Sequence, residues 1–352
     1  MKLRASHFDY PLEESLIAQK PVARGESRLM TLDRASGHIA DDRFDRVPEL
    51  LRNDDLLVLN DTRVIPAGFT CRRKTGGRIE GLFLREHPSG RWEVLLRSAG
   101  RCKPGETLDL VGSPTSTVRM NENLGQGRWS VSPVPAAPAA ELLDEAGVTP
   151  LPPYIHRADR SRDGLDRDRY QTLFADRPGS VAAPTAGLHF SRDLLDRLDA
   201  KGIGRVTVTL HVGLGTFAPV KCEDLSKHRM HREWYELGEE AASALNAARA
   251  AGRRIVAVGT TSLRVLETLG GKDAFGPCSG MTDLFIYPPA DFHAVGAMIT
   301  NFHLPRSTLL MLVSAFCCPG KTDGLDLILG AYRHAIRQRY RFYSYGDAML
   351  IE

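Results

Sequence analysis

The stretch RRIVAVGTTSLRVLETLGG, from Arg253 to Gly271, places an apolar strand pattern directly before an amphipathic helix pattern. Its first part is a short β-rich run that ends at Gly259, and its second part has apolar residues at helical spacing followed by glycines. The same order of strand and helix recurs around two other apolar runs, at 205–212 and 295–302. Strands that alternate with helices predict a largely parallel sheet covered by helices on its faces.

A different pattern lies between about Phe69 and Val134. Short alternating runs are separated there by turns rich in Gly, Pro, Asn and Ser, which is typical of a small antiparallel barrel or sandwich. A proline-rich return at Pro150 to Pro153 closes this segment. We therefore predict the α/β class: an α/β/α layered main domain (residues 1–64 and 151–352) with an inserted small antiparallel β-barrel domain (residues 65–150).

The composition is that of an ordinary globular protein, with 42% hydrophobic and 25% charged residues among 352. There is no apolar run of the roughly 20 residues that a membrane-spanning helix needs, and the N-terminal stretch lacks a signal-peptide pattern. We expect a cytoplasmic protein without a membrane partner. The six cysteines form no CxxC pair, so we expect reduced thiols and no metal site. A net charge of +3 neither requires nor opposes a nucleic-acid partner.

Polar residues gather in five turns, each beside an apolar strand, and ligands of α/β sheets bind at such strand ends. These turns are Asn60 to Arg63, Pro184 to Phe190, His211 to Phe217, Gly259 to Ser262 and Asn301 to Thr308. In the second turn, Pro-Thr-Ala-Gly forces a tight bend that delivers His189 to a specific place.

The hydroxyls of Thr260, Thr261 and Ser262 can cap the helix that follows them, where free N–H groups and the helix dipole favour a carboxylate or phosphate. An ordinary N-cap, which needs only one hydroxyl, is the alternative. Ser307 or Thr308 can cap the apolar helix after His303 in the same way.

Two glycines, Gly213 and Gly215, allow a ligand to approach the backbone closely, and Thr216 can form a hydrogen bond with it. A plain tight turn is the alternative, and the GxGxF spacing differs from a dinucleotide fingerprint.

His231 and Glu233 are two residues apart and would share one face of a strand, where they could transfer protons near neutral pH. The aromatic side chain of Trp234 or Tyr235 could stack on a base. A surface pair beside a half-buried tryptophan is the alternative. The charged stretch 156–169 is predicted to be a solvated loop, with an RNA-contacting or lid role as its alternative.

A basic hairpin offers a place for a polyanion. Its four cations, around Gly76 and Gly77, are Arg72, Arg73, Lys74 and Arg78. A solvated hairpin without a ligand is the alternative.

Taken in order, these motifs resemble one family, the S-adenosylmethionine:tRNA ribosyltransferase-isomerases of queuosine biosynthesis. The resemblance runs from FDYPLEESLIAQKP (Phe8 to Pro21) through SVAAPTAGLHF, HVGLGTFAPV and VGTTSLRVLE to ITNFHLPRSTLLMLVSAF and the final YRFYSYGDAMLIE. It implies transfer of the ribose part of S-adenosylmethionine to 7-aminomethyl-7-deazaguanine at the tRNA wobble position, which yields epoxyqueuosine, adenine and methionine. It also implies that S-adenosylmethionine is consumed as a substrate, that no metal or other cofactor takes part, and that the protein is a monomer.

The chemistry implied by the resemblance needs a base, an acid and a dry pocket. The candidate acids and bases are His189, His211, His231, Glu233, Asp283 and His303. The candidate substrate-binding residues are Asn60, Asp61, Thr62, Arg63, Pro184, Thr185, Gly187, Gly213, Gly215, Thr216, Thr260, Thr261, Ser262, Asn301, Ser307 and Thr308. Residues 60–63 and the basic hairpin are expected to face the tRNA.

Two other functions fit the same residues. An S-adenosylmethionine-dependent tRNA methyltransferase would release S-adenosylhomocysteine instead of adenine and methionine. A non-catalytic RNA-binding protein would bind RNA in a salt-sensitive way without turnover, and it would leave the five polar turns without a role.

Overall fold

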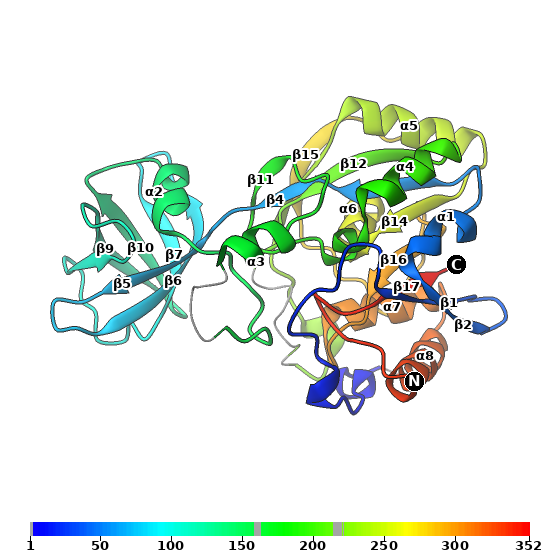
Figure 1. The fold of residues 1–352 in the computed structure, drawn as a ribbon, viewed down its shortest axis with the longest axis horizontal. Coiled ribbons are helices and arrows are strands. Elements are labelled where there is room, and N and C mark those ends of the chain that lie inside the picture. Colours follow the sequence, from blue (N-terminus) through cyan, green and yellow to red (C-terminus); the bar gives the residue numbers. More distant parts are fainter. Residues whose placement is uncertain (1–2, 158–162, 214–219, 221) are drawn as a thin grey trace. The chain divides into compact units, whose positions relative to one another are not determined.

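The computed structural model describes residues 3–157, 163–213, 220 and 222–352. The chain divides into two compact units, coloured along the sequence in Figure 1. The main unit comprises Met1–Arg63, Pro152–His156 and Gln171–Glu352, and the barrel unit comprises Val64–Leu151 and Arg157–Tyr170. The segment from Arg157 to Tyr170, which the sequence placed in the main domain, therefore belongs to the barrel unit.

The main unit is built on a nine-stranded sheet with the strand order β15-β13-β12-β3-β14-β16-β17-β1-β2. In that order the strands are Cys278–Thr282, Glu233–Leu237, Gly204–Leu210, Leu56–Asn60, Ile255–Val258, Ala297–Asn301, Ala348–Ile351, Arg28–Leu32 and Ile39–Arg43. The four central strands, β12, β3, β14 and β16, are parallel as predicted. Toward both edges the pairing is antiparallel, apart from the parallel pair β1 and β17, so the expectation of a largely parallel sheet holds only at the centre.

Both faces of the sheet are covered, which is why β3 is buried along its whole length. Leu56 and Val58 pack into one core cluster, whereas Leu57 and Leu59 pack into another, as the alternation of side chains along a strand requires. Helices α5 to α8 cover the first face, and α1 and α4 cover the second (Figure 1). These six helices are Glu239–Ala250, Gly259–Leu269, Thr308–Cys317, Gly324–Arg337, Val47–Leu50 and Arg192–Ala200.

Short elements complete the main unit. Strand β11 (Arg177–Ser180) pairs with β4 (Thr62–Val64). The described 3₁₀ turns are η1 (Ala5–Phe8), η2 (Glu14–Leu16), η3 (Phe44–Arg46), η4 (Thr185–His189) and η6 (Leu225–Lys227). Among the described residues no helix is both long and apolar enough to reach across a bilayer. All six cysteines are free thiols.

The barrel unit contains the predicted closed antiparallel barrel, with the strand order β10-β7-β6-β5-β8-β9. Its strands β5 to β10 are Gly68–Arg72, Arg78–Glu86, Trp92–Arg97, Thr107–Leu110, Thr117–Gly125 and Arg128–Val134. Side chains fill the interior, as is usual for so small a barrel. A Cβ on Gly81 would lie 2.3 Å from the ring of Phe69, so the glycine is what admits this ring. Helix α2 (Ala139–Ala146) follows the last strand.

The charged stretch that the sequence suggested to be a solvated loop is partly a helix, α3 (Asp163–Arg169). Its charges pair within the barrel unit: Arg157 donates two hydrogen bonds of 2.8 Å to the carboxylate of Asp166, which is 5% exposed. Arg167 donates hydrogen bonds to Asp163 and to the carbonyl oxygen of Gly147, the C-cap residue that follows α2. For these charged residues, local pairing of opposite charges therefore replaces the solvation that the composition suggested.

Candidate active site

A narrow cavity of about 50 Å³ lies at the ends of the central strands of the main unit. Four of the five polar turns contribute residues to its lining, as the position of strand ends in an α/β sheet predicts. The predicted site residues that line the cavity are Pro184, Thr185, Thr260, Thr261, Asn301, His303 and Ser307.

Helix α6 presents an uncapped N-terminus to this cavity. Its N-cap residue is Val258, which provides no side-chain hydrogen bond, and Ser262 bonds back to the carbonyl oxygen of Val258 at 2.9 Å. The prediction that Thr260, Thr261 or Ser262 caps the helix is therefore wrong. Gly259, with a φ of +89°, makes the turn from strand to helix that starts α6. The hydroxyl oxygen of Thr261 is buried, and among the described residues it has no hydrogen-bond partner. The N-terminus of α6 and this hydroxyl remain available to an anion.

The orientation of the Asn301 amide follows from its neighbours. The carbonyl oxygen of Tyr343 can only accept, so the Asn301 Nδ2 group donates to it at 3.3 Å. Asn301 Oδ1 then accepts the hydroxyl hydrogen of Thr185 at 2.9 Å. Because Thr185 has given its hydrogen to Asn301, its lone pairs are left for a hydrogen-bond donor in the cavity.

The same amide fixes the tautomer of His189, the residue that the Pro-Thr-Ala-Gly turn delivers. Asn301 Nδ2 lies 3.1 Å from His189 Nε2, which must accept, so the ring hydrogen sits on Nδ1 and is donated to Ser27 Oγ at 2.8 Å. Burial, helped by the positive charges of Arg341 and Arg24, lowers the pKa of His189 to about 3. His189 is thus neutral and has no free lone pair, so its geometry suits the orientation of Asn301 and not the abstraction of a proton.

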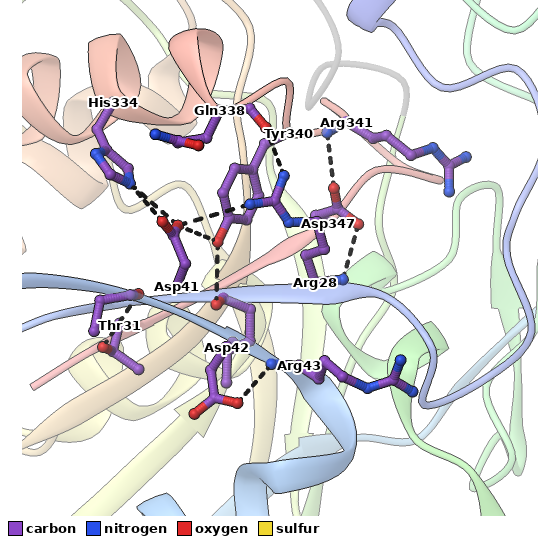
Figure 2. Close-up of polar contacts among 12 residues, drawn as sticks. Arg28, Thr31, Asp41, Asp42, Arg43, His334, Gln338, Tyr340, Arg341 and Asp347 are labelled. Carbon is purple, nitrogen blue, oxygen red and sulfur yellow. Dashed lines mark hydrogen bonds and ion pairs between the residues drawn. The ribbon is translucent and has the colours of Figure 1, made fainter.

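Ser27 immediately precedes β1, and Figure 2 shows the contacts that hold the start of this strand. The buried carboxylate of Asp347 accepts the backbone N–H groups of Arg28 at 3.0 Å and of Arg341 at 2.8 Å. On the neighbouring strand, Asp41 accepts hydrogen bonds from His334 and from the hydroxyl of Tyr340. These contacts fix the start of β1, and with it the hydroxyl of Ser27, against the segment that follows α8.

His303 is buried in the wall of the cavity, and burial lowers its pKa to about 3. Its Nε2 atom lies 2.9 Å from the hydroxyl of Thr300, and its backbone N–H donates to the hydroxyl of Tyr332 at 2.9 Å. Tyr10 donates its hydroxyl hydrogen to the carbonyl oxygen of His303. The imidazole is thus neutral at pH 7 and is held rigidly at the cavity.

His211 ends up beside the turn at residues 60–63 and is not in the cavity lining. Its Nδ1 atom lies 2.7 Å from the hydroxyl of Thr62, and its ring stacks on Trp234 with centroids 4.9 Å apart. Burial lowers the pKa of this half-buried histidine. The next residue, Val212, does line the cavity.

The remaining polar groups of residues 60–63 tie strand ends together. Asn60 exchanges two 3.1 Å hydrogen bonds with the backbone of Leu210, and Asp61 accepts the hydroxyl hydrogen of Thr209 at 2.7 Å. Burial raises the pKa of Asp61. Arg63 donates to the carbonyl oxygen of Ala175.

Glu233 is buried and forms an ion pair with the guanidinium of Arg264, which is also buried. Its other carboxylate oxygen accepts the backbone N–H of Gly213 at 2.8 Å. Strand β13 begins at Glu233, so His231 precedes it and is exposed. The expectation that His231 and Glu233 share a strand face is therefore wrong, because the strand starts too late.

The other predicted residues have varied positions. Asp283 is exposed, away from the cavity lining. Gly187 packs against Thr172 and Phe174, where a Cβ would lie 2.8 and 2.7 Å from their side chains. Ser307 is the predicted N-cap of α7, and Thr308 is buried behind it. Gly215 and Thr216 lie outside the described residues.

Several cavity or support residues escaped the sequence reasoning. They are Ser27, Tyr154, Thr300, Tyr343 and Ser344. Thr300 precedes a predicted residue, and Tyr343 and Ser344 lie in the final motif YRFYSYGDAMLIE, so position within a motif could have indicated them. Nothing near Ser27 in the sequence indicates its contact with His189, which lies 162 residues away.

The two buried neutral histidines predict a loss of stability in acid. The pKa values of His189 and His303 lie near 3 in the folded protein, whereas an unfolded histidine has a pKa near 6.5. Between these values the unfolded chain binds more protons, so the stabilising effect is complete above pH 6.5 and is lost as pH falls. We expect the free energy of unfolding to decrease by about 1 kcal/mol for each histidine between pH 7.5 and 5.5. Urea unfolding at both pH values measures this decrease, which should be smaller by about 1 kcal/mol in His189→Gln; equal decreases would contradict the assignment.

Comparisons with known proteins agree with the resemblance in the sequence. The family model described as queuosine biosynthesis protein matches residues 5–351. Two curated proteins named S-adenosylmethionine:tRNA ribosyltransferase-isomerase are each 48% identical to this chain. The protein from Symbiobacterium thermophilum matches over 99% of this chain and 100% of its own length. The protein from Geobacter sulfurreducens matches over 98% of this chain and 99% of its own length.

A solved structure is similar along the whole chain. The crystal structure of S-adenosylmethionine tRNA ribosyltransferase from Thermotoga maritima is 36% identical, with a TM-score of 0.56 over 99% of this chain and 100% of that one. This structure, the family match and the curated relatives all indicate the same family. The chain belongs to the queuosine biosynthesis protein family, a family of S-adenosylmethionine:tRNA ribosyltransferase-isomerase enzymes.

Proposed function

We propose that this enzyme transfers and isomerises the ribosyl part of S-adenosylmethionine onto 7-aminomethyl-7-deazaguanine at the tRNA wobble position. The products are epoxyqueuosine in the tRNA, free adenine and methionine. S-adenosylmethionine is a consumed substrate in this reaction, and we propose that no further cofactor or metal takes part and that the protein acts as a monomer. The names of the curated relatives support the substrates, and the uncapped N-terminus of α6 at the cavity is the observation that carries the proposal for this chain.

The cavity suits the amino-acid end of S-adenosylmethionine. Its volume of about 50 Å³ has room for a small polar head group such as that of an amino acid. The N-terminus of α6 and the unpartnered hydroxyl of Thr261 favour the carboxylate. Thr185, whose lone pairs are free, favours the ammonium group. The nucleoside part then extends out of the cavity.

Two histidines are the best candidates for proton transfer. His303 lines the cavity, and His211 lies one residue from it; burial lowers both pKa values, so both rings are neutral at pH 7 and able to accept a proton. One would remove the proton from the ribose 5′ carbon beside the sulfonium, and the imidazolium formed in this way would pass the proton on to the departing adenine. His189 and Glu233 already have their hydrogen-bonding atoms engaged, and we assign them to positioning.

Analysis of the products tests the proposed reaction. The purified protein is incubated with S-adenosylmethionine and tRNA that carries 7-aminomethyl-7-deazaguanine, and the small products are identified by mass. Free adenine and methionine, with the ribosyl mass added to the tRNA, are the expected result. S-adenosylhomocysteine would instead indicate the methyltransferase alternative, and RNA binding without any product would indicate a non-catalytic RNA-binding protein.

Removal of one hydroxyl tests the carboxylate site. Thr261→Val keeps the shape of the side chain but removes its hydrogen-bonding group, and a hydrogen bond to a charged group contributes about 1.5–3 kcal/mol. We expect KM for S-adenosylmethionine to rise at least about 10-fold. Thr268→Val is the matched control on the same helix, because its hydroxyl bonds to Arg264 and Thr282. Equal KM values for both variants would place the carboxylate elsewhere.

A further inference from the structure

The barrel unit contains a groove of about 500 Å³ on the outer wall of its barrel. Along β5, the side chains of Phe69 and Cys71 point inward and are buried, so those of Thr70 and Arg72 point outward by the alternation of a strand, and Gly68 lines the groove with its backbone. The opposite wall comes from residues 148–151 and from the segment that carries α3. The groove is thus a feature of this unit alone and separate from the cavity described above.

The far wall of the groove is fixed by charges that neutralise one another. Arg157 and Asp166 form a two-armed ion pair with side chains 18% and 7% exposed. Asp163 accepts the backbone N–H of Thr149 at 2.8 Å and pairs with Arg167. These contacts hold the wall rigidly but leave it without net charge.

The near wall has two positive charges side by side, with Asp109 opposite Arg72 on the other neighbouring strand, β8. Arg72 and Arg78 are directly opposite each other on β5 and β6, and both line the groove. Like charges in such a cross-strand pair repel each other. Within the described residues Arg72 has no ion pair, and Arg78 has only a 3.5 Å contact with Glu80, with both side chains more than half exposed. An anion between the two guanidiniums would be attracted by both of them and would lower this repulsion further than Asp109 and Glu80 do.

The other two cations of the hairpin differ. Arg73 donates to Glu106 at 2.6 and 3.1 Å and is only 24% exposed, so it is committed to the barrel. Lys74 lies in the turn and does not line the groove. Of the four predicted tRNA-binding cations, Arg72 and Arg78 are therefore the pair that a ligand in the groove can reach.

We infer that this groove binds one unpaired nucleotide of the tRNA substrate, with its phosphate between Arg72 and Arg78. The inference rests on the proposed function, because it takes tRNA as the substrate. The groove has the volume of a small-molecule pocket, and Val111, Val148 and Leu151 give it apolar walls that a base can contact. Proteins read RNA mostly at unpaired bases that can leave the stack, whereas a base within a duplex cannot enter such a groove.

The test compares two double variants that each remove two positive charges. Arg72→Gln/Arg78→Gln alters the groove, and the matched control Arg91→Gln/Arg119→Gln removes two exposed arginines elsewhere on the barrel unit. Binding is measured with an anticodon stem-loop RNA and with an RNA duplex of equal length, over a range of salt concentrations.

We expect the groove variant to bind the stem-loop about 10-fold more weakly. The slope of log Kd against the logarithm of the salt concentration should be smaller by about 1. Its binding to the duplex should equal that of the control. Stem-loop affinity within twofold of the control, or equal losses for both RNAs, would overturn the inference. Release of adenine by the wild-type enzyme is measured in parallel. If adenine is released and the groove variant binds normally, only the groove assignment fails; if no adenine is released, the proposed function fails by itself.

Discussion

His189→Ala should lower kcat about 100-fold while the protein remains folded, because the loss of the imidazole frees the Asn301 amide to rotate. Asn301 orients the hydroxyl of Thr185 at the cavity, and a small displacement of a positioned group can reduce the rate by about two orders of magnitude. KM for S-adenosylmethionine should rise as well, since the proposed function places Thr185 against the ligand in the ground state.

His189→Gln distinguishes positioning from proton transfer. The carbonyl oxygen of glutamine can take the place of Nε2 and accept from Asn301, but it cannot carry a proton at neutral pH. We expect this variant to recover most of the activity that His189→Ala loses, with a pH profile like that of the wild type. His231→Ala is the matched control, because His231 is exposed and outside the cavity lining. If the glutamine variant is as inactive as the alanine variant, His189 acts as an acid or base.

Glu233→Ala should lower the free energy of unfolding by about 3–5 kcal/mol, since it leaves the buried guanidinium of Arg264 without its counter-ion. It also removes the acceptor of the Gly213 N–H, next to the turn that begins at His211. Chemical denaturation of the wild type and the variant measures the difference. Glu236→Ala, on the same strand, is the control: its contact with Arg177 is 3.9 Å long and half-exposed, so a change of less than about 1 kcal/mol is expected.

Glu233→Gln separates the structural role from a catalytic one. Glutamine can still accept from Gly213 but loses the charge that Arg264 requires, so we expect reduced stability together with a reduced rate. A variant of wild-type stability that has lost turnover would instead mean that Glu233 transfers a proton, and Arg264 would then have another role.

Local pattern was sufficient to predict the central sheet, the barrel and the turns that supply most of the cavity lining. The strand from Ile255 to Val258 and helix α6 are adjacent in sequence, so their junction could be predicted from spacing alone. The cap was mispredicted because Gly259 starts the helix, which places Ser262 where it bonds back to Val258. A hydroxyl-rich sequence does not reveal such a one-residue shift.

Long-range contacts account for most of what the sequence could not predict. The tautomer of His189 depends on Ser27 and Asn301, which lie 162 and 112 residues away. The role of Glu233 depends on Arg264, which is 31 residues away on another element. Residue type and strand position indicated that both side chains matter, but only their partners distinguish a group that moves protons from one that holds its neighbours.

The position of β17 has a consequence for the order in which the main unit assembles during synthesis. Ala348–Ile351 lies between β16 and β1, so β1 and β2 are joined to the rest of the sheet only through this strand. The contact between Arg28 and Asp347 spans 319 residues. While the ribosome is still translating, the hairpin of β1 and β2 has an unpaired edge, and Ser27 lacks the carboxylate that fixes its neighbour. The central strands can pair earlier, but the support of His189 is completed only after nearly the whole chain has emerged.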